Sequence, residues 1–123
     1  MPPRRLFPFL ACMFLLLAPA CAAKKIDHRA EALQRARGLP SALPGMSVEK
    51  AVEQVLADMK ASRIKVVPGR WYCNRAIEHE KAEVYKVGFE FTQAGRPTRF
   101  GWIYRYDNNK LEPITDYARQ VTP

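Results

Sequence analysis

The chain has 123 residues, with 20 lysines and arginines against 12 aspartates and glutamates, so its formal net charge is +8. We expect a chain of that length to form one small domain whose core is covered by one or two helices. The basic excess favours anionic partners such as phospholipid headgroups, lipopolysaccharide, acidic glycans or nucleic acid.

The first 20 residues have the pattern of an export signal. Arg4 and Arg5 form a positive start, residues 6–17 are apolar, and residues 18–20 are small, as required before a cleavage site. The apolar run is shorter than the roughly 20 residues that span a bilayer, and prolines flank it. We therefore expect residues 1–20 to be a cleaved leader. The protein would be exported by the secretory route or, given the two arginines, by the twin-arginine route.

Residues 17–21, Leu-Ala-Pro-Ala-Cys, resemble the lipobox of bacterial lipoproteins, in which small residues precede a cysteine that becomes the acylated first residue. The leucine stands four residues before Cys21 where the family has it three before, so ordinary cleavage after Ala20 or Ala23 is the alternative. The resemblance implies acyl chains such as palmitate on Cys21. Because Ala22 replaces the aspartate of proteins retained at the inner membrane, it also implies an outer-membrane location facing the periplasm.

Export changes the charge and the cysteine count. Loss of Arg4 and Arg5 leaves 18 basic against 12 acidic residues, a net charge of +6, and it makes nucleic acid an unexpected partner. The mature chain keeps Cys73 and, depending on cleavage, Cys21. We expect Cys73 to be a small buried hydrophobe on a strand, although an unacylated Cys21 would allow a disulfide between the two.

Residues 21–46 are expected to join the leader to the domain. Asp27 is placed to cap a short helix through Arg37, with Gly38 as its stop, but few apolar residues mark a buried face. This segment is therefore predicted to be either a weakly docked helix or a basic tether. Residues 39–45, with two prolines and a glycine, have the composition of a linker.

The folded domain is predicted over residues 47–123 and begins with an amphipathic helix over 47–61. Ser47 is a good N-cap, and the apolar residues that follow recur at helical spacing, which produces one face in need of a partner. These residues are Val48, Ala51, Val52, Val55, Leu56 and Met59.

Two strands, over residues 83–92 and 99–107, each have one aromatic face because apolar and polar residues alternate. A two-residue turn at Gly95-Arg96 would place Phe91 opposite Phe100 and Tyr85 opposite Tyr106. The aromatic residues are expected to form the core beneath the helix. They are Phe89, Phe91, Phe100, Trp102 and Tyr104.

Two further strands complete the predicted sheet. A turn at Asn108-Asn109 pairs Arg105 with Glu112 and starts a short strand over residues 110–115, which Pro113 confines to an edge. A strand is also predicted over residues 70–77, followed by an odd-length loop at 79–81. It places Trp71, Cys73 and Ile77 on the aromatic face. Arg75 falls on the same face, where a charged side chain is unexpected.

The expected fold is α+β, with one amphipathic helix packed on an antiparallel meander of about four strands. This element order resembles the cystatin-like and NTF2-like domains, which combine a helix with a curved sheet, although no signature motif accompanies it. The resemblance implies a small exported protein that inhibits, assists assembly or binds a ligand. The fold itself does not choose among these functions.

Catalytic chemistry is sparse in this sequence. His79 lies between two glutamates in a predicted turn, and Cys73 is predicted to face inward, so neither fits a metal site or a reactive thiolate. No phosphate-binding loop or serine nucleophile motif is present. We therefore expect a protein that is not an enzyme and that needs no metal or other cofactor.

The sheet face opposite the aromatic residues offers the best candidate surface. Lys86, Glu90, Ile103 and Arg105 lie on it together with two glycines, where another chain could approach closely. The leading hypothesis is an envelope protein that holds a protein partner through this face or the edge strand. The alternatives are a binder of anionic glycan or lipid, and a soluble periplasmic or secreted protein without lipid.

Overall fold

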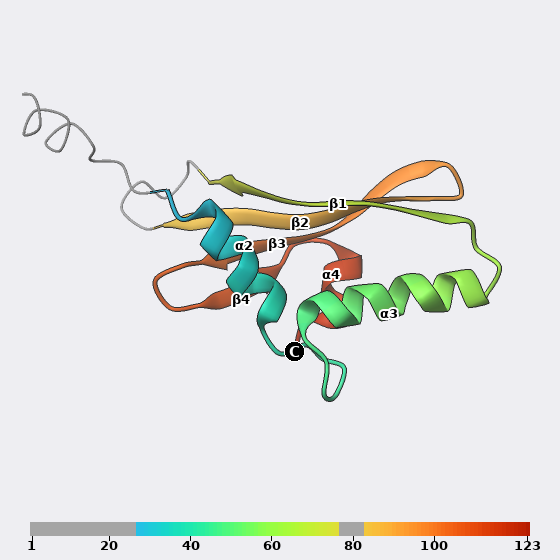
Figure 1. The fold of residues 1–123 in the computed structure, drawn as a ribbon, viewed down its shortest axis with the longest axis horizontal. Helices are drawn as coiled ribbons and strands as arrows, with labels where there is room; N and C mark the ends of the chain where they lie inside the picture. Colours follow the sequence, from blue (N-terminus) through green and yellow to red (C-terminus); the bar gives the residue numbers. More distant parts are fainter. Residues whose placement is uncertain (1–26, 77–82) are drawn as a thin grey trace, which may run out of the picture.

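The computed structural model describes residues 27–76 and 83–123, and it confirms the predicted α+β class. Four antiparallel strands form one sheet in the order β1-β2-β3-β4, so β1 and β4 are its edges. The helices of this part of the chain lie on one side of the sheet (Figure 1). The elements are α2 (Arg29–Gly38), α3 (Val48–Ala61), β1 (Val66–Arg75), β2 (Val84–Gln93), β3 (Arg96–Arg105), β4 (Lys110–Pro113) and α4 (Asp116–Val121).

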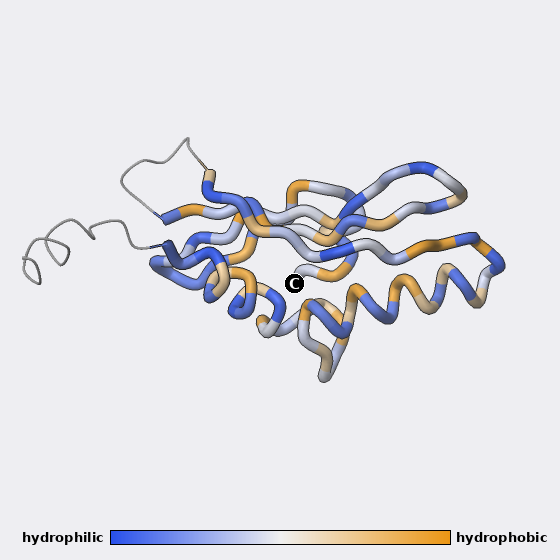
Figure 2. Tube along the Cα trace, turned by 45° about the horizontal axis from the view of Figure 1, so that its top comes forward, coloured by the Kyte–Doolittle hydropathy of each residue, from blue (hydrophilic) through white to orange (hydrophobic). Residues whose placement is uncertain are grey.

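Helix α3 is the predicted amphipathic helix. The Ser47 side chain accepts a hydrogen bond from the backbone N–H of Lys50 at 3.3 Å, which confirms the N-cap. Along α3, hydrophobic and hydrophilic residues alternate at the spacing of the helical turn (Figure 2). The apolar positions face the sheet, where Val48, Ala51, Val52, Leu56 and Met59 are buried.

The aromatic residues form the core beneath the helices, as predicted. Phe100, Trp102 and Tyr104 are fully buried, and their neighbours on β2 are almost as inaccessible. The Phe100 and Trp102 rings stack with centroids 6.1 Å apart, and Trp71 of β1 stacks on Trp102 at 6.0 Å. Burial of such large side chains contributes most of the hydrophobic stabilisation of a small domain.

The β2–β3 hairpin has the predicted faces but not the predicted register. The turn residues are Ala94 and Gly95, both with positive φ, so Gln93 pairs with Arg96. Phe91 therefore lies opposite Thr98, whereas we expected Phe100. The prediction was wrong by two positions because moving a turn by one residue shifts every pairing by two, which keeps each side chain on the same face.

The β3–β4 connection is longer than predicted. Arg105 pairs with Lys110, so the loop spans residues 106–109 and the expected two-residue turn at Asn108-Asn109 was wrong. Glu112 consequently lies opposite Ile103 on the neighbouring strand. The predicted charge pair still forms diagonally, with 3.4 Å between Arg105 Nε and Glu112 Oε1.

Strand β1 begins at Val66, four residues before the predicted start. Trp71 lies opposite Phe89 and Cys73 opposite Val87, which confirms their placement on the aromatic face. The register shifts between Pro68 and Trp71, where β1 carries one residue more than β2, as in a β-bulge. Ile77 and the loop at 79–81 lie outside the described residues.

Of the two alternatives predicted for residues 21–46, the structure contains a docked helix. Ala32 and Ala36 of α2 are fully buried, and their small side chains let the helix approach the sheet closely. The following residues are also packed, because Leu39 and Leu43 contact the core and Ala42 donates a backbone hydrogen bond to Val121. The packed unit thus extends to the N-terminal side of residue 47.

The C-terminal helix α4 was not predicted, and the edge strand expected over residues 110–115 is shorter than predicted. Strand β4 ends at Pro113, and the Thr115 hydroxyl caps α4 by accepting a hydrogen bond from the Ala118 N–H at 3.2 Å. Ala118 and Val121 are buried against the core. The chain ends beside the α2–α3 connection (Figure 1).

Candidate interaction face

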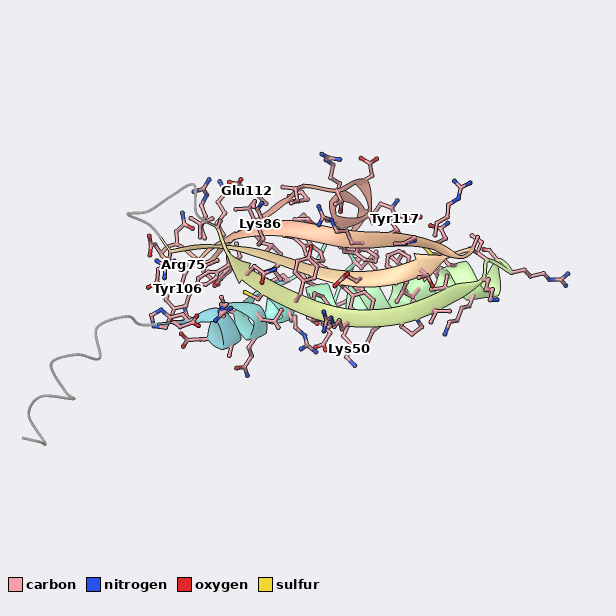
Figure 3. All side chains as sticks on the ribbon, turned by 90° about the horizontal axis from the view of Figure 1, so that it is seen from above. Lys50, Arg75, Lys86, Tyr106, Glu112 and Tyr117 are labelled. Carbon is pink, nitrogen blue, oxygen red and sulfur yellow. The ribbon has the colours of Figure 1, made fainter. Side chains whose placement is uncertain are left out.

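The sheet face that points away from the helices is called here the open face. Successive side chains of a strand point to opposite sides, so the residues that alternate with the buried aromatics share this face. In the described part of the chain, no helix lies on this side of the sheet. The open face carries Tyr72, Asn74, Lys86, Glu90, Arg99, Ile103, Arg105 and Glu112, and Figure 3 looks down on it.

The four residues predicted for this surface all lie on it. Lys86 and Glu90 are exposed on β2, and Ile103 and Arg105 are half-buried on β3. Lys86 is paired with Ile103, and Glu112 lies on the other side of Ile103. An apolar side chain thus sits between two charged ones at the centre of the β3–β4 half of the open face.

Two glycines divide the open face. Gly88 and Gly101 pair across β2 and β3, and both are covered by neighbouring side chains. The Tyr72 ring lies directly over Gly88, where a β-carbon would overlap it. On the other side, Gly101 is covered by Thr115 and by Ile114, whose side chain remains 42% exposed.

The β1 side of the open face contains a hollow of about 320 Å³. It is lined by Arg70, Tyr72, Asn74, Glu90 and Arg99. Glu90 and Arg99 are cross-strand partners, and Arg70 Nε lies 3.8 Å from Glu90 Oε1. Arg99 also donates to the Tyr72 hydroxyl at 3.5 Å.

The hollow was not predicted from the sequence. Of the residues that line it, only Glu90 was predicted to lie on this face. The bulge in β1 decides which residue stands beside Glu90, and a bulge has no reliable sequence signal. A weak signal does exist, because Pro68-Gly69 interrupts the strand pattern just before Arg70.

Cys73 does not lie on the open face. It is half-buried on the helix side of β1, and burial raises the pKa of its thiol from an ordinary 9.0 to about 11. The thiol therefore keeps its proton at neutral pH, which is the opposite of what a nucleophile needs. His79, the other residue considered for catalysis or metal binding, lies outside the described residues.

A second polar cluster joins α2 to the sheet. His28 Nδ1 lies 2.7 Å from Glu83 Oε2, and the His28 ring stacks on Tyr106 with centroids 4.4 Å apart. The Arg35 guanidinium also lies over the Tyr106 ring, 4.5 Å from the ring centroid. The cluster could not be predicted from the sequence, because its contacts join residues more than 50 positions apart. Across residues 27–76 and 83–123, no three potential ligand side chains gather as a metal site would need.

Cys21 lies outside the described residues, so its acylation stays a prediction. None of the helices in residues 27–76 and 83–123 combines the length and the hydropathy that crossing a bilayer requires.

The fold and the open face together define an α+β protein with a four-stranded antiparallel sheet covered by helices on one side. Comparison of the chain with protein-family models, curated proteins and solved structures found no match. The resemblances to lipoproteins and to cystatin-like or NTF2-like domains are therefore carried only by the sequence features given above.

Proposed function

We propose that this protein is exported to the cell envelope, anchored to the outer membrane through acyl chains on Cys21, and acts there as an interaction module without enzymatic activity. The leader over residues 1–20 and the lipobox-like residues 17–21 support export and anchoring. Several acyl chains hold a protein firmly, because each buried methylene contributes about 0.8 kcal/mol.

The observation that carries the interaction role is the open face of the sheet. The three helices lie on the aromatic side, and the other side presents Ile103 and Ile114 among charged residues. An apolar centre with a charged rim is the usual anatomy of a protein interface. We therefore assign the protein contact to the β3–β4 half of this face.

The face suits a partner better than the edge of β4 does. Strand addition requires a row of free backbone donors and acceptors, and Pro113 has no donor. β4 is also only four residues long, from Lys110 to Pro113. Contacts made by the side chains of the open face do not depend on backbone hydrogen bonds along this short strand.

Site-directed photo-crosslinking in the native host tests the contact. A crosslinking residue in place of Lys86 or Arg105 should form one dominant adduct with an envelope protein, and an added Ile103→Glu substitution should abolish it. The matched control replaces Glu53, which is exposed on α3 on the other side of the molecule. Equal adducts from position 53, or none from the open face at native abundance, would rule out the proposed interface.

The anchoring has its own test, the intact mass of the mature protein from the native membrane fraction. A chain that begins at Cys21 and carries acyl chains supports the proposal. A chain that begins at Cys21 without lipid, at Ala22 or at Lys24 favours the alternative of a soluble periplasmic or secreted protein.

A second candidate function is the binding of an anionic envelope glycan or lipid. The charge of the open face favours it, because the basic residues Arg70, Lys86, Arg99 and Arg105 outnumber Glu90 and Glu112. Such binding should weaken steeply as salt is added, since exposed charges are screened over about 10 Å at 0.1 M ionic strength. Binding that is independent of salt would exclude this candidate.

A further inference from the structure

We propose that the hollow on the β1 side of the open face binds a carboxylate-bearing sugar residue of an acidic glycan. The proposal deepens the glycan-binding candidate and rests on it, because it requires the open face to be a binding surface. It does not depend on the protein contact assigned to the β3–β4 half.

The backbone builds the hollow. At the bulge, Gly69 lies against the backbone of Glu90 so closely that any side chain there would overlap the Glu90 carbonyl. The bulge inserts Arg70 beside this contact, and its side chain, 85% exposed, reaches the same hollow as Arg99 from β3. Bulges commonly re-aim a side chain in this way.

The two arginines supply the anion-binding groups. Arg70 approaches Glu90 at 3.8 Å and Arg99 reaches the Tyr72 hydroxyl at 3.5 Å, so both internal contacts are long. A guanidinium has five N–H donors in a planar fork that matches a carboxylate. Each arginine therefore has donors to offer a ligand without losing a strong internal bond.

The charge of the hollow favours one negative charge on the ligand. Arg70 and Arg99 contribute +2 and Glu90 contributes −1, so the lining residues sum to +1. The Glu90 carboxylate would repel a doubly charged phosphate more strongly than a carboxylate. A uronic acid residue, with one carboxylate on a sugar ring, matches this balance.

Tyr72 supplies a platform for the ring. The Tyr72 ring lies over Gly88, and its hydroxyl accepts a hydrogen bond from Arg99. The side chain remains partly exposed at the hollow. The negative face of an aromatic ring attracts the weakly positive C–H groups of a sugar. Asn74 and Glu90 lie next to the platform and can exchange hydrogen bonds with sugar hydroxyls.

The size of the hollow is compatible with this ligand. Its volume of about 320 Å³ lies near the lower end of the range of about 300–1,000 Å³ for small-molecule sites. One ring of a glycan fits such a volume, while the rest of the glycan continues over the open face.

Calorimetric titration of the purified mature protein with oligogalacturonate tests the proposal. The same oligosaccharide with its carboxylates methyl-esterified is the matched neutral ligand, and we expect its affinity to be at least about tenfold lower, the loss of a charged hydrogen bond. Arg70→Gln and Arg99→Gln should each weaken oligogalacturonate binding by a similar factor. Arg96→Gln, which removes an exposed arginine outside the hollow, should change it less than about twofold.

The assignment would be overturned by no binding of oligogalacturonate, by equal affinity for the methyl ester, by equal weakening by Arg96→Gln, or by equal affinity for a glutamate oligopeptide of the same charge. Effective competition by inorganic phosphate would likewise replace the sugar with a phosphate ligand. Because the titration uses purified protein, these failures are separate from those of the crosslinking test. Adducts from position 86 without oligogalacturonate binding would leave the interaction module intact and remove only the sugar site.

Discussion

Trp102 donates a hydrogen bond from its indole Nε1 to the hydroxyl of Thr122, 2.9 Å away. The indole is fully buried on β3, whereas Thr122 follows the last turn of α4. A buried indole N–H needs a partner, so this bond ties the C-terminal helix to the core of the sheet.

Thr122→Val removes the acceptor and keeps the shape of the side chain. We expect the free energy of unfolding to fall by about 1–3 kcal/mol, because the indole N–H is left buried without a partner. Urea denaturation measures this change. Thr122→Ser keeps the hydroxyl and should cost clearly less, so equal losses in the two variants would show that the hydrogen bond is unimportant.

Gly88→Ala tests the packing of Tyr72 on the glycine. A β-carbon at Gly88 would overlap the Tyr72 ring, and overpacking of this kind costs about 1–3 kcal/mol. In a Tyr72→Ala background the same change should be neutral or stabilising by up to about 1 kcal/mol, since alanine restricts the unfolded strand more than glycine. Denaturation of the four proteins in this double-mutant cycle measures the coupling. Equal effects of Gly88→Ala in both backgrounds would contradict the packing.

Ala32→Asp tests the docking of α2. Ala32 is fully buried, so an aspartate there should lower the free energy of unfolding by more than about 2 kcal/mol or undock the helix. Hydrogen exchange should show loss of protection in the amides of α2 before those of β2 and β3. Ala30→Asp is the matched control, because Ala30 is exposed in the same helix. Similar losses from both substitutions would show that α2 is not held by its buried face.

The pH dependence of Cys73 alkylation tests the burial of β1. Burial raises the pKa of the thiol from 9.0 to about 11, so the rate of alkylation by iodoacetamide should rise with a midpoint near pH 11 in the folded protein. In the unfolded protein the midpoint should lie near pH 9. Cys73→Ser provides the background from any other thiol. A midpoint near 9 in the folded protein would show that the thiol is exposed.

The raised pKa of the Cys73 thiol makes the folded protein less stable at alkaline pH. From pH 9 to pH 11 the unfolded chain has lost the thiol proton that the folded chain still holds, so the unfolded state binds fewer protons. The free energy of unfolding therefore falls as the pH rises through this window, and Cys73 contributes no such slope below it. Urea titrations at several pH values should show a smaller alkaline loss in Cys73→Ser.

Periodicity was enough to predict the faces of the sheet and of α3. Alternation in β2 and β3 assigns each side chain to one side, and this held even though both predicted hairpin registers were displaced by two. The displacement at the first hairpin arose because Ala94 adopts a φ of 51°, a conformation that the sequence does not signal for alanine. The alternation thus determines on which side of the sheet each side chain lies, and the position of the turn determines which residue it faces on the next strand.

Tertiary contacts explain what periodicity missed. α2 has few apolar residues, yet it docks because two alanines fit closely against the sheet and because His28 and Arg35 flank Tyr106. The positions of Lys86, Glu90, Ile103 and Arg105 on the open face were predicted from the alternation. The hollow depends instead on the bulge in β1 and on Tyr72 lying over Gly88. Neither relationship can be found from the spacing of residues along one strand.

Each edge of the sheet contains a proline, Pro68 in β1 and Pro113 in β4. A proline cannot donate to a neighbouring strand, and in β1 the adjoining bulge also distorts the line of the backbone. Two copies that met edge to edge would therefore find no continuous template on which to extend the sheet. The two prolines therefore protect the protein from polymerising through its sheet edges, and the broad face of each copy stays accessible.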